Sequence, residues 1–393
     1  MDSIRNPFSP NAGSRPPELV GRDDVLEMAR VMIGRTQLRR SAQSILMTGL
    51  RGVGKTVVLN EVLCNAEKAG NVVPVYIEAS ESRRLGELLA APLKMELLKL
   101  SRIEGAKAAA CRGLSVLRNF LGSIKITFGE VGIELESMPG EGDSGDMQYD
   151  LRALLAAVAE AALARDRAVI LMIDEVQYLS QEEMEALVMS MHHMQQRQLP
   201  LAMIGVGLPI LAKLAGEAKS YAERLFKYPV IGALPDADTR RAIEAPFAAE
   251  HVHLNSDAMD AVCRETGGYP FFIQEWGSQL WNFVDREQIT IEDVEKVRSV
   301  VYSSLDASFF RIRMERTTPS ERKFMYAMAD VGNGDDKCRL SDVAAKMGVS
   351  QKSLGPCRAS LIRKGMVYGS GHGLISFTVP MFSDFLRRNG GLG

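Results

Sequence analysis

The residues with the clearest chemical role form a glycine-rich segment in the first part of the chain. Residues 49–56 read Gly-Leu-Arg-Gly-Val-Gly-Lys-Thr, which fits the phosphate-binding pattern G-x-x-x-x-G-K-[ST]. Glycines let backbone N–H groups turn toward phosphate oxygens, and the N-terminus of a following helix adds positive potential. In this pattern Lys55 would reach the outer phosphates, and Thr56 would offer its hydroxyl to Mg2+. We therefore predict an ATP site formed by Gly49, Leu50, Arg51, Gly52, Val53, Gly54, Lys55, Thr56 and Val57.

An apolar segment that ends in two acids would supply the second half of this chemistry. Residues 168–175 read Ala-Val-Ile-Leu-Met-Ile-Asp-Glu, the form of a Walker B strand, which delivers a carboxylate to Mg2+ at its C-terminal end. Asp174 would bind the metal ion, and Glu175 would polarise the attacking water, a role typically worth roughly 10²- to 10⁴-fold in rate. The alternative is a buried strand that ends in a solvated acidic turn. The phosphate-binding segment upstream favours Mg2+-dependent ATP hydrolysis.

Short apolar segments predict the strands that position these residues. They are residues 44–48, 72–77, 169–173 and 201–206. Longer stretches with helical spacing alternate with them, for example 57–66, and the first helix begins at Arg22 after an irregular arm. This alternation predicts an α/β fold, in which helices cover both faces of a parallel sheet.

The first predicted domain, residues 1–234, contains this sheet and an insertion near residues 120–148. Within the insertion, segments 124–128 and 132–136 predict a small hairpin. The following residues, 139–147, are rich in Gly, Ser, Asp and Glu, so we expect a mobile loop there.

Two further domains are predicted after the sheet. Residues 235–316 have a wholly helical pattern, with candidate breaks at Asn255 and at Gly267-Gly268. Residues 317–393 form a third unit, because Thr318-Pro-Ser-Glu321 fits a helix capping box with proline in the first turn.

Bulk properties are those of an ordinary globular protein. The 393 residues allow two or three domains, and the 24% charged and 46% hydrophobic residues exclude wholesale disorder. No apolar run approaches the roughly 20 residues that a bilayer span needs, and the first ten residues lack the apolar core of a secretory signal. We therefore expect a cytoplasmic protein without membrane contact. The five cysteines are scattered without a C-x-x-C pair, which predicts reduced core thiols.

Charge is unevenly distributed along the chain. The formal net charge is only -2, yet the segment from Thr317 onward holds eleven Lys and Arg residues against six Asp and Glu residues. This asymmetry suggests a basic module joined to a neutral or acidic domain, and such a module is a candidate for binding nucleic acid.

These motifs resemble those of the AAA+ ATPases, over nearly the whole chain. The nearest branches are the origin-recognition initiators and a bacterial ATPase family with the same three-part layout. Residues 19–23, Leu-Val-Gly-Arg-Asp, resemble the entry motif that packs near the adenine, which makes Val20 and Gly21 candidates for the adenine pocket. The alternative is an ordinary entry into a helix.

The resemblance also implies roles, and departures, further along the chain. Arg224 lies where relatives carry an arginine that reaches the neighbouring subunit's ATP, which would couple hydrolysis to homo-oligomer assembly. The alternative is a surface ion pair with Glu223 or another acid.

Residues 266–272, Thr-Gly-Gly-Tyr-Pro-Phe-Phe, resemble the lid turn of the signal-transducing (STAND) ATPases, and they lack the usual second-sensor arginine. Residues 204–207, Ile-Gly-Val-Gly, also lack the Asn or Thr of the first sensor. We therefore expect slow hydrolysis.

The C-terminal segment resembles a winged helix-turn-helix domain. Its three helices would span residues 320–330, 341–347 and about 353–364, with Gly348 in the turn, and its wing strands would be 366–368 and 374–378 around a loop at 369–373. Duplex DNA is then a possible partner of residues 317–393, through Lys352, Arg358, Arg363 and Lys364. The alternative is a solvated or packing face. Two functions therefore stay open: an ATP-dependent DNA-associated switch or loader, and a signalling ATPase whose winged helix binds a protein partner or its own core.

Overall fold

The computed structural model describes residues 1–11, 13–124, 141–332, 337–371 and 373–390. The chain divides into two compact units. The sheet unit contains Arg22–Gly49 and Lys55–Val230, and the helical unit contains Met1–Gly21, Leu50–Gly54 and Ile231–Gly393.

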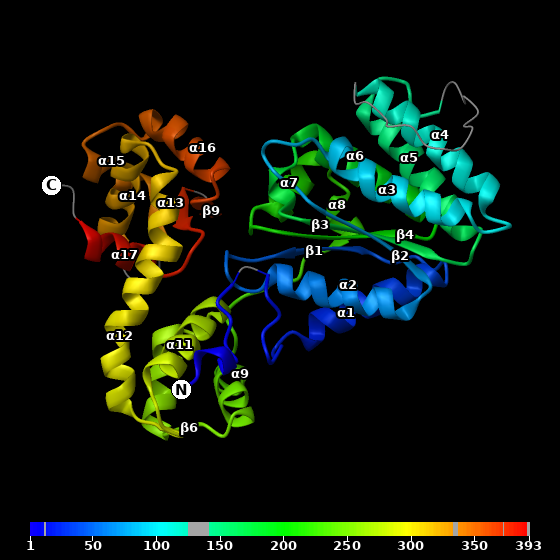
Figure 1. Cartoon of the computed structure of the whole chain (residues 1–393). Helices are drawn as coiled ribbons and strands as arrows, with labels where there is room; N and C mark the ends of the chain where they lie inside the picture. Colours follow the sequence, from blue (N-terminus) through cyan, green and yellow to red (C-terminus); the bar gives the residue numbers. More distant parts are fainter. Residues whose placement is uncertain (12, 125–140, 333–336, 372, 391–393) are drawn as a thin grey trace. The chain divides into compact units, whose positions relative to one another are not determined.

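The sheet unit is built on five parallel strands in the order β2-β3-β4-β1-β5 (Figure 1). The strands are β1 (Ser44–Thr48), β2 (Val72–Glu78), β3 (Ala168–Asp174), β4 (Leu201–Gly207) and β5 (Phe226–Lys227). The four predicted strands are confirmed to within a residue at each end. Strands β1, β3 and β4 are buried throughout, as expected of parallel strands covered on both faces. The edge strand β5 was missed because two residues are too few to show a pattern.

Helices cover both faces of this sheet (Figure 1). One face carries α1 (Asp23–Gln37) and α2 (Lys55–Ala69), and the other carries α3 (Leu85–Ser101), α5 (Met147–Leu163), α6 (Gln181–Gln196) and α7 (Leu211–Ala218). A further helix, α4 (Lys107–Ser123), packs against α3 and α5. The short elements η2 (Val176–Tyr178) and α8 (Ala222–Leu225) complete the unit. This arrangement is the predicted α/β fold.

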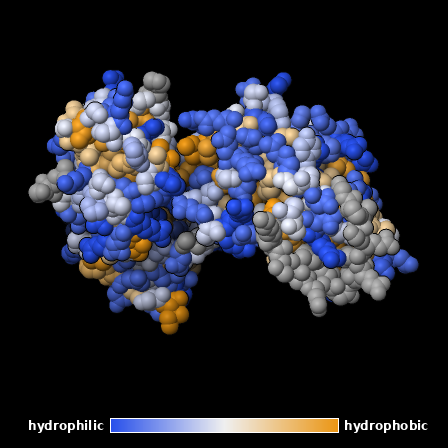
Figure 2. Space-filling view, turned by 90° about the horizontal axis from the view of Figure 1, so that it is seen from above, coloured by the Kyte–Doolittle hydropathy of each residue, from blue (hydrophilic) through white to orange (hydrophobic). Residues whose placement is uncertain are grey.

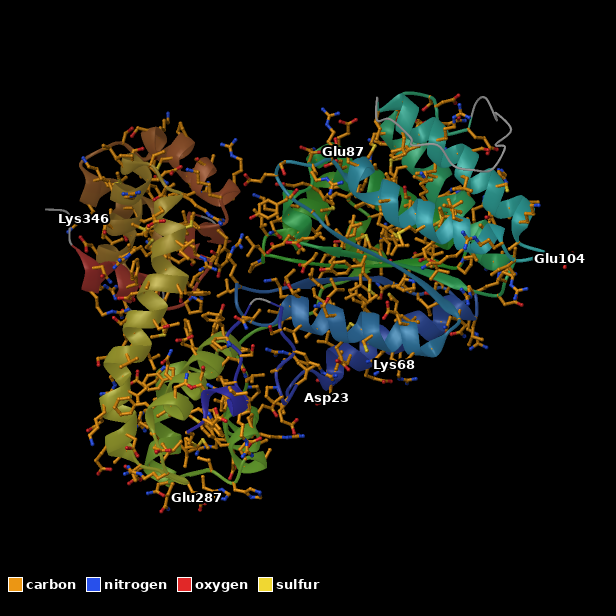
Figure 3. All side chains as sticks on the ribbon, in the orientation of Figure 1. Asp23, Lys68, Glu87, Glu104, Glu287 and Lys346 are labelled. Carbon is orange, nitrogen blue, oxygen red and sulfur yellow. The ribbon has the colours of Figure 1, made fainter. Side chains whose placement is uncertain are left out.

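Charges at the helix ends complement the helix dipoles of this unit. Asp23 lies in the first turn of α1, and Lys68 lies in the last turn of α2 (Figure 3).

The predicted hairpin lies outside the described residues, except for Ile124. The described end of the predicted loop, residues 141–146, leads into α5, where Asp146 caps the helix and Ser144 donates two hydrogen bonds to Asp150.

The helical unit contains the segment predicted to be wholly helical. Its helices are α9 (Asp236–Ala249), α10 (Ser256–Thr266), α11 (Pro270–Phe283), α12 (Ile291–Leu305), the π-helical turn η3 (Asp306–Phe310) and α13 (Arg311–Glu315). The prediction was incomplete, because β6 (His253–Leu254) pairs in parallel with β7 (Gln288–Ile289). The N-terminal arm, with a short 3-10 turn at Ser3–Arg5, packs on these helices: the rings of Phe8 and Phe247 lie 4.7 Å apart.

The C-terminal module, residues 319–389, belongs to the same unit. It contains α14 (Pro319–Val331), β8 (Lys337–Arg339), α15 (Leu340–Met347), η4 (Gln351–Leu354), α16 (Gly355–Arg363), β9 (Val367–Gly371), β10 (Leu374–Phe377) and α17 (Phe382–Asn389). Antiparallel pairing gives the strand order β8-β10-β9. The three predicted helices and two predicted strands are present. The sequence missed β8 and α17, and the predicted loop at 369–373 was too long, because β9 continues to Gly371 and pairs there with Leu374.

The hydropathy of the surface and the state of the cysteines bear on the predicted class of protein. Hydrophilic residues cover most of the face seen in Figure 2. Across the described part of the chain, no helix has the length and apolar character needed to cross a membrane. None of the five cysteines forms a disulfide, but only Cys338 is fully buried and the other four are half-buried, so the expectation of core thiols was too strong.

Candidate active site

The phosphate-binding segment connects β1 to α2, as the sequence predicted. The Gly49 N–H donates to the carbonyl oxygen of Gly207 at 3.1 Å, which ties the start of the segment to the end of β4. Gly52 and Gly54 have φ values of +84° and +89°, a left-handed backbone that side chains other than glycine rarely adopt. Lys55 is the first residue of α2 and is only 7% exposed. The backbone therefore has the turn and the helix N-terminus that phosphate binding needs.

The two motifs, 118 residues apart in sequence, meet at a hydrogen bond. Thr56 Oγ1 donates to Asp174 Oδ2 at 2.7 Å. Asp174 is 3% exposed, and burial raises the pKa of its carboxyl group, although hydrogen bonds from Thr56 and from the Glu175 N–H partly offset that effect. A hydroxyl and a carboxylate oxygen are hard ligands of the kind that Mg2+ prefers. These two residues therefore fit a magnesium ion, which would also neutralise the buried carboxylate.

Glu175 follows in a left-handed backbone conformation, with φ +53° and ψ +39°. A non-glycine residue in this region costs on the order of 1–3 kcal/mol, and such strain persists where neighbours hold it. Its N–H donates to Asp174 Oδ1 at 2.7 Å, and its Oε2 accepts a hydrogen bond from Gln177 Nε2. Gln177 Oε1 in turn accepts the Leu208 N–H at 3.0 Å. No sequence motif singles out Gln177, whose only signal is its position two residues after the acidic pair.

Strand β2 adds two titratable groups beside the acidic pair. The parallel register places Tyr76 opposite Met172 and Glu78 opposite Asp174. Burial, and then the negative charges of Asp174 and Glu78, raise the pKa of Tyr76 to about 12. Burial and the charges of Asp174 and Glu175 likewise raise the pKa of Glu78. Negative charge is therefore concentrated at this end of the sheet, where a divalent cation would relieve it. Neither residue was predicted, because only the register brings β2 to this point.

The tip of the phosphate-binding segment, Leu50–Gly54, belongs to the helical unit. The Tyr269 hydroxyl donates to the Arg51 carbonyl oxygen, and the Phe271 N–H donates to that of Gly52 at 3.3 Å. The Arg51 N–H donates to the Thr378 carbonyl oxygen at 3.1 Å. A Cβ added at Gly52 would lie 3.0 Å from Tyr269 Cε1. Residues at the start of α11 and in the C-terminal module thus fix the backbone of this tip.

The remaining predicted site residues are placed as follows. Val20 is buried, and Gly21 has φ +66° with Asp238 Oδ2 only 2.7 Å from where its Cβ would be. Both belong to the helical unit, as does the loop tip. Arg224 lies in the sheet unit, at the end of α8, with an exposed side chain. It forms no ion pair with any acid in the described ranges, so the predicted alternative of a pair with Glu223 is not observed.

Comparison with known proteins supports the nucleotide chemistry. Residues 18–204 match the model of the AAA ATPase domain family, and residues 307–386 match that of a domain of unknown function, DUF8462. A Walker-type ATPase of Pyrococcus abyssi is similar in structure over 95% of this chain and 97% of that chain, with 14% identity and a TM-score of 0.58. The ORC2 protein of Aeropyrum pernix, in ADPNP–ADP complexes, is similar over 96% of both chains, with 14% identity and a TM-score of 0.53. No curated protein shows significant sequence similarity to this chain.

At such low identity the two structures establish only a shared fold. The family match carries more weight, because it covers the phosphate-binding segment, the acidic pair and most of the five-stranded sheet. The chain therefore matches the AAA ATPase domain over residues 18–204, and this match supports ATP hydrolysis as the activity of the protein.

Proposed function

We propose that the protein is a slow ATP-dependent switch or loader that acts on duplex DNA through its C-terminal module. The observation that best supports the nucleotide half is the 2.7 Å hydrogen bond from Thr56 to Asp174, with Glu175 next in the chain. In the proposed site, N–H groups of residues 49–57 bind the ATP phosphates, Lys55 neutralises their outer charge, and Val20 and Gly21 lie near the adenine.

Hydrolysis in this site depends on the two acids. Thr56 and Asp174 would hold Mg2+, which, when bound, neutralises charge developing on the phosphates. Glu175 would accept a proton from the water that attacks the terminal phosphate. The end of β4 has no polar side chain, and the segment 266–272 has no arginine, so turnover is expected to be slow.

The DNA half of the proposal rests on the C-terminal module. Its order of helices and strands supports a winged helix-turn-helix, in which α16 would be the helix that enters the major groove. Lys352 and Arg363 are exposed and Arg358 is half-buried. Lys364 has a different role from the one predicted, because its Nζ lies 2.7 Å from Oε2 of the buried Glu321. The proposal therefore keeps three candidate phosphate contacts, Lys352, Arg358 and Arg363, of the four that the sequence suggested.

Salt-dependent binding of duplex DNA to the full chain, with and without Mg-ATP, tests this proposal. Each phosphate contact contributes a slope of roughly -0.9 to log affinity against log salt, so Lys352→Ala with Arg363→Ala should flatten the slope by about two units. The matched control removes two exposed lysines of the sheet unit, Lys68 (Figure 3) and Lys213, and should leave the slope unchanged. Absence of duplex binding at low salt in both nucleotide states would remove the loader function.

A signalling ATPase of the STAND type is the second candidate. The specific observation in its favour is the hydrogen bond from the Arg51 N–H to the Thr378 carbonyl oxygen, at 3.1 Å within the helical unit. In that case the winged helix serves as a packing surface for the protein's own nucleotide loop, or for a protein partner. ATP-dependent exposure of the module without any DNA affinity would favour this function.

A further inference from the structure

The C-terminal end of β4 has no polar side chain of its own, since Gly205, Val206 and Gly207 form it. A polar group from another element lies there instead. Gln177, in η2 after β3, places its amide between this strand end and Glu175. Its Oε1 accepts the Leu208 N–H at 3.0 Å, and its Nε2 donates to Glu175 Oε2.

Hydrogen-bonding capacity fixes the orientation of this amide. A carboxylate can only accept and a backbone N–H can only donate, so the nitrogen must face Glu175 and the oxygen must face Leu208. The left-handed conformation of Glu175 turns the chain sharply at the end of β3, and the fully buried Val176 anchors the turn that follows. Gln177 is thereby held from both sides, and it in turn holds one oxygen of the Glu175 carboxylate.

Gly207 makes room for this amide. A Cβ added at position 207 would overlap Gln177 Oε1 and would lie 3.0 Å from Leu211 Cδ1. Gly207 does not have a positive φ, so its backbone would tolerate a side chain. Space, rather than backbone conformation, therefore requires glycine at this position, and Gly207 and Gln177 form a matched pair.

We propose that Gln177 is a positioning residue that orients the Glu175 carboxylate toward the attacking water, with Gly207 keeping the space it needs. The inference rests on the proposed role of Glu175 as the general base. Because Gln177 holds one carboxylate oxygen, it fixes the rotation of the carboxylate, and a small misplacement of a reacting group can cost as much as roughly 100-fold in rate. The contact acts on catalysis and not on nucleotide affinity.

Two substitutions of Gln177 separate positioning from a structural role. Gln177→Glu keeps an oxygen for the Leu208 N–H but has no N–H to donate to Glu175, whereas Gln177→Leu removes both contacts. Both variants should lose about 10- to 100-fold in kcat with KM changed less than about threefold. Gln181→Leu is the control, because Gln181 makes a comparable hydrogen bond to Glu185 at 3.1 Å on the exposed start of α6; it should retain wild-type kcat. Wild-type turnover of Gln177→Glu would overturn the proposal.

Combining substitutions at Gln177 and Glu175 gives a second readout. If Gln177 acts through Glu175, their effects on turnover are not additive, whereas a merely structural role would give additive losses. In a Glu175→Gln background, which should itself turn over at least roughly tenfold more slowly than wild type, Gln177→Leu should cause no further loss. An additive loss would show that Gln177 supports the fold and not the base. If Glu175→Gln hydrolyses ATP at the wild-type rate, the proposed base is wrong, and that failure is distinct from a wild-type rate in the Gln177 variants alone.

A double-mutant cycle tests the pair formed with Gly207. Gly207→Ala should reduce kcat about as much as the Gln177 substitutions, since the new methyl group displaces the amide. In a Gln177→Ala background the same change should cost at most about twofold, because the space is then empty. The new contact with Leu211 is present in both backgrounds and cancels in the comparison. Equal losses in both backgrounds would refute the pairing of Gly207 with Gln177.

Discussion

At the scale of single residues, the buried carboxylate of Asp174 lowers the stability of the folded protein when it is ionised. Burial raises the pKa of its carboxyl, with the hydrogen bonds from Thr56 and the Glu175 N–H acting in the opposite direction. An acid whose pKa is higher in the folded than in the unfolded protein lowers stability as pH rises through the unfolded value, and the cost is complete above the folded value. A bound cation would compensate for this cost.

Asp174→Asn should therefore raise the melting temperature of the nucleotide-free protein at pH 7 to 8. Asparagine keeps an oxygen for the Thr56 hydroxyl but not one for the Glu175 N–H, and we expect the removal of a buried charge to outweigh that lost hydrogen bond. The gain should shrink as pH falls toward about 4, the unfolded pKa of aspartate, since wild type is then protonated as well. The same variant should lose any stabilisation by Mg2+ in the presence of ATP. Thermal melts across pH and Mg2+ concentration measure both effects, and a variant less stable than wild type at pH 8 would contradict the first.

Lys55 should control nucleotide binding. At about 100 times its dissociation constant a ligand adds about 2.7 kcal/mol to the stability of the domain that binds it, and each kcal/mol moves the midpoint of a 150- to 250-residue domain by about 2–4 °C. Mg-ATP should therefore raise the melting temperature by several degrees, and Lys55→Ala should abolish that shift. Lys68→Ala, in the last turn of the same helix, is the control and should keep it. A full shift in Lys55→Ala would place the nucleotide elsewhere.

At the scale of elements, the first helix of the C-terminal module is joined to α16 through a buried carboxylate. Glu321 closes the capping box at the start of α14 and also accepts hydrogen bonds from Ser360 Oγ and Lys364 Nζ, both at 2.7 Å. Burial alone would oppose ionisation, but the hydrogen bonds from Lys364, Ser360 and the Thr318 N–H outweigh it and lower the pKa of Glu321 to about 2. Glu321 thus accepts a backbone hydrogen bond at the start of α14 and also links α14 to α16.

Lys364→Met should destabilise the module by about 1.5–3 kcal/mol at pH 7, the usual value of a hydrogen bond to a charged group. A carboxylate with a lowered pKa contributes stability that is complete above its unfolded pKa of about 4.3 and is lost as pH falls to about 2. The difference between variant and wild type should therefore narrow across that window. Urea denaturation followed by circular dichroism measures it, with Lys352→Met as the exposed control. A difference that stays constant down to pH 2 would rule out the ion pair as its source.

At the scale of the whole molecule, Arg224 bears on assembly. Its side chain is exposed and forms no ion pair with the described acids, which leaves it available to a second copy of the chain. If subunits associate head to tail, as in rings or filaments, this arginine would reach a neighbouring ATP.

Turnover per subunit should then rise with protein concentration. Arg224→Ala should lower kcat by at least about tenfold while ATP affinity stays nearly unchanged, as expected of a group that acts mainly in the transition state. Lys227→Ala, a nearby exposed cation in β5, serves as the control. Turnover that is independent of concentration and survives the Arg224 substitution would instead describe a monomeric switch.

The sequence alone determined the features whose signal lies in contiguous residues. The segment 49–56 and the acidic pair at 174–175 are each short enough to be recognised by spacing. The four long strands are continuous apolar runs, because both faces of a parallel sheet are buried. The capping box at Thr318 and the proline in the first turn of the same helix were equally local, and the structure places both as predicted.

Tertiary structure alone decided the contacts between segments that are distant in sequence. In the sequence Lys364 is one member of a basic stretch. In the fold its Nζ lies 2.7 Å from Oε2 of Glu321, which is 43 residues earlier in the chain. Tyr76 and Glu78 join the acidic end of the sheet only because the register sets β2 beside β3. Gln177 reaches Leu208 only because the chain turns at Glu175 and β4 lies next to β3. A sequence carries no direct record of such neighbours, since the packing of the whole core determines which side chains meet.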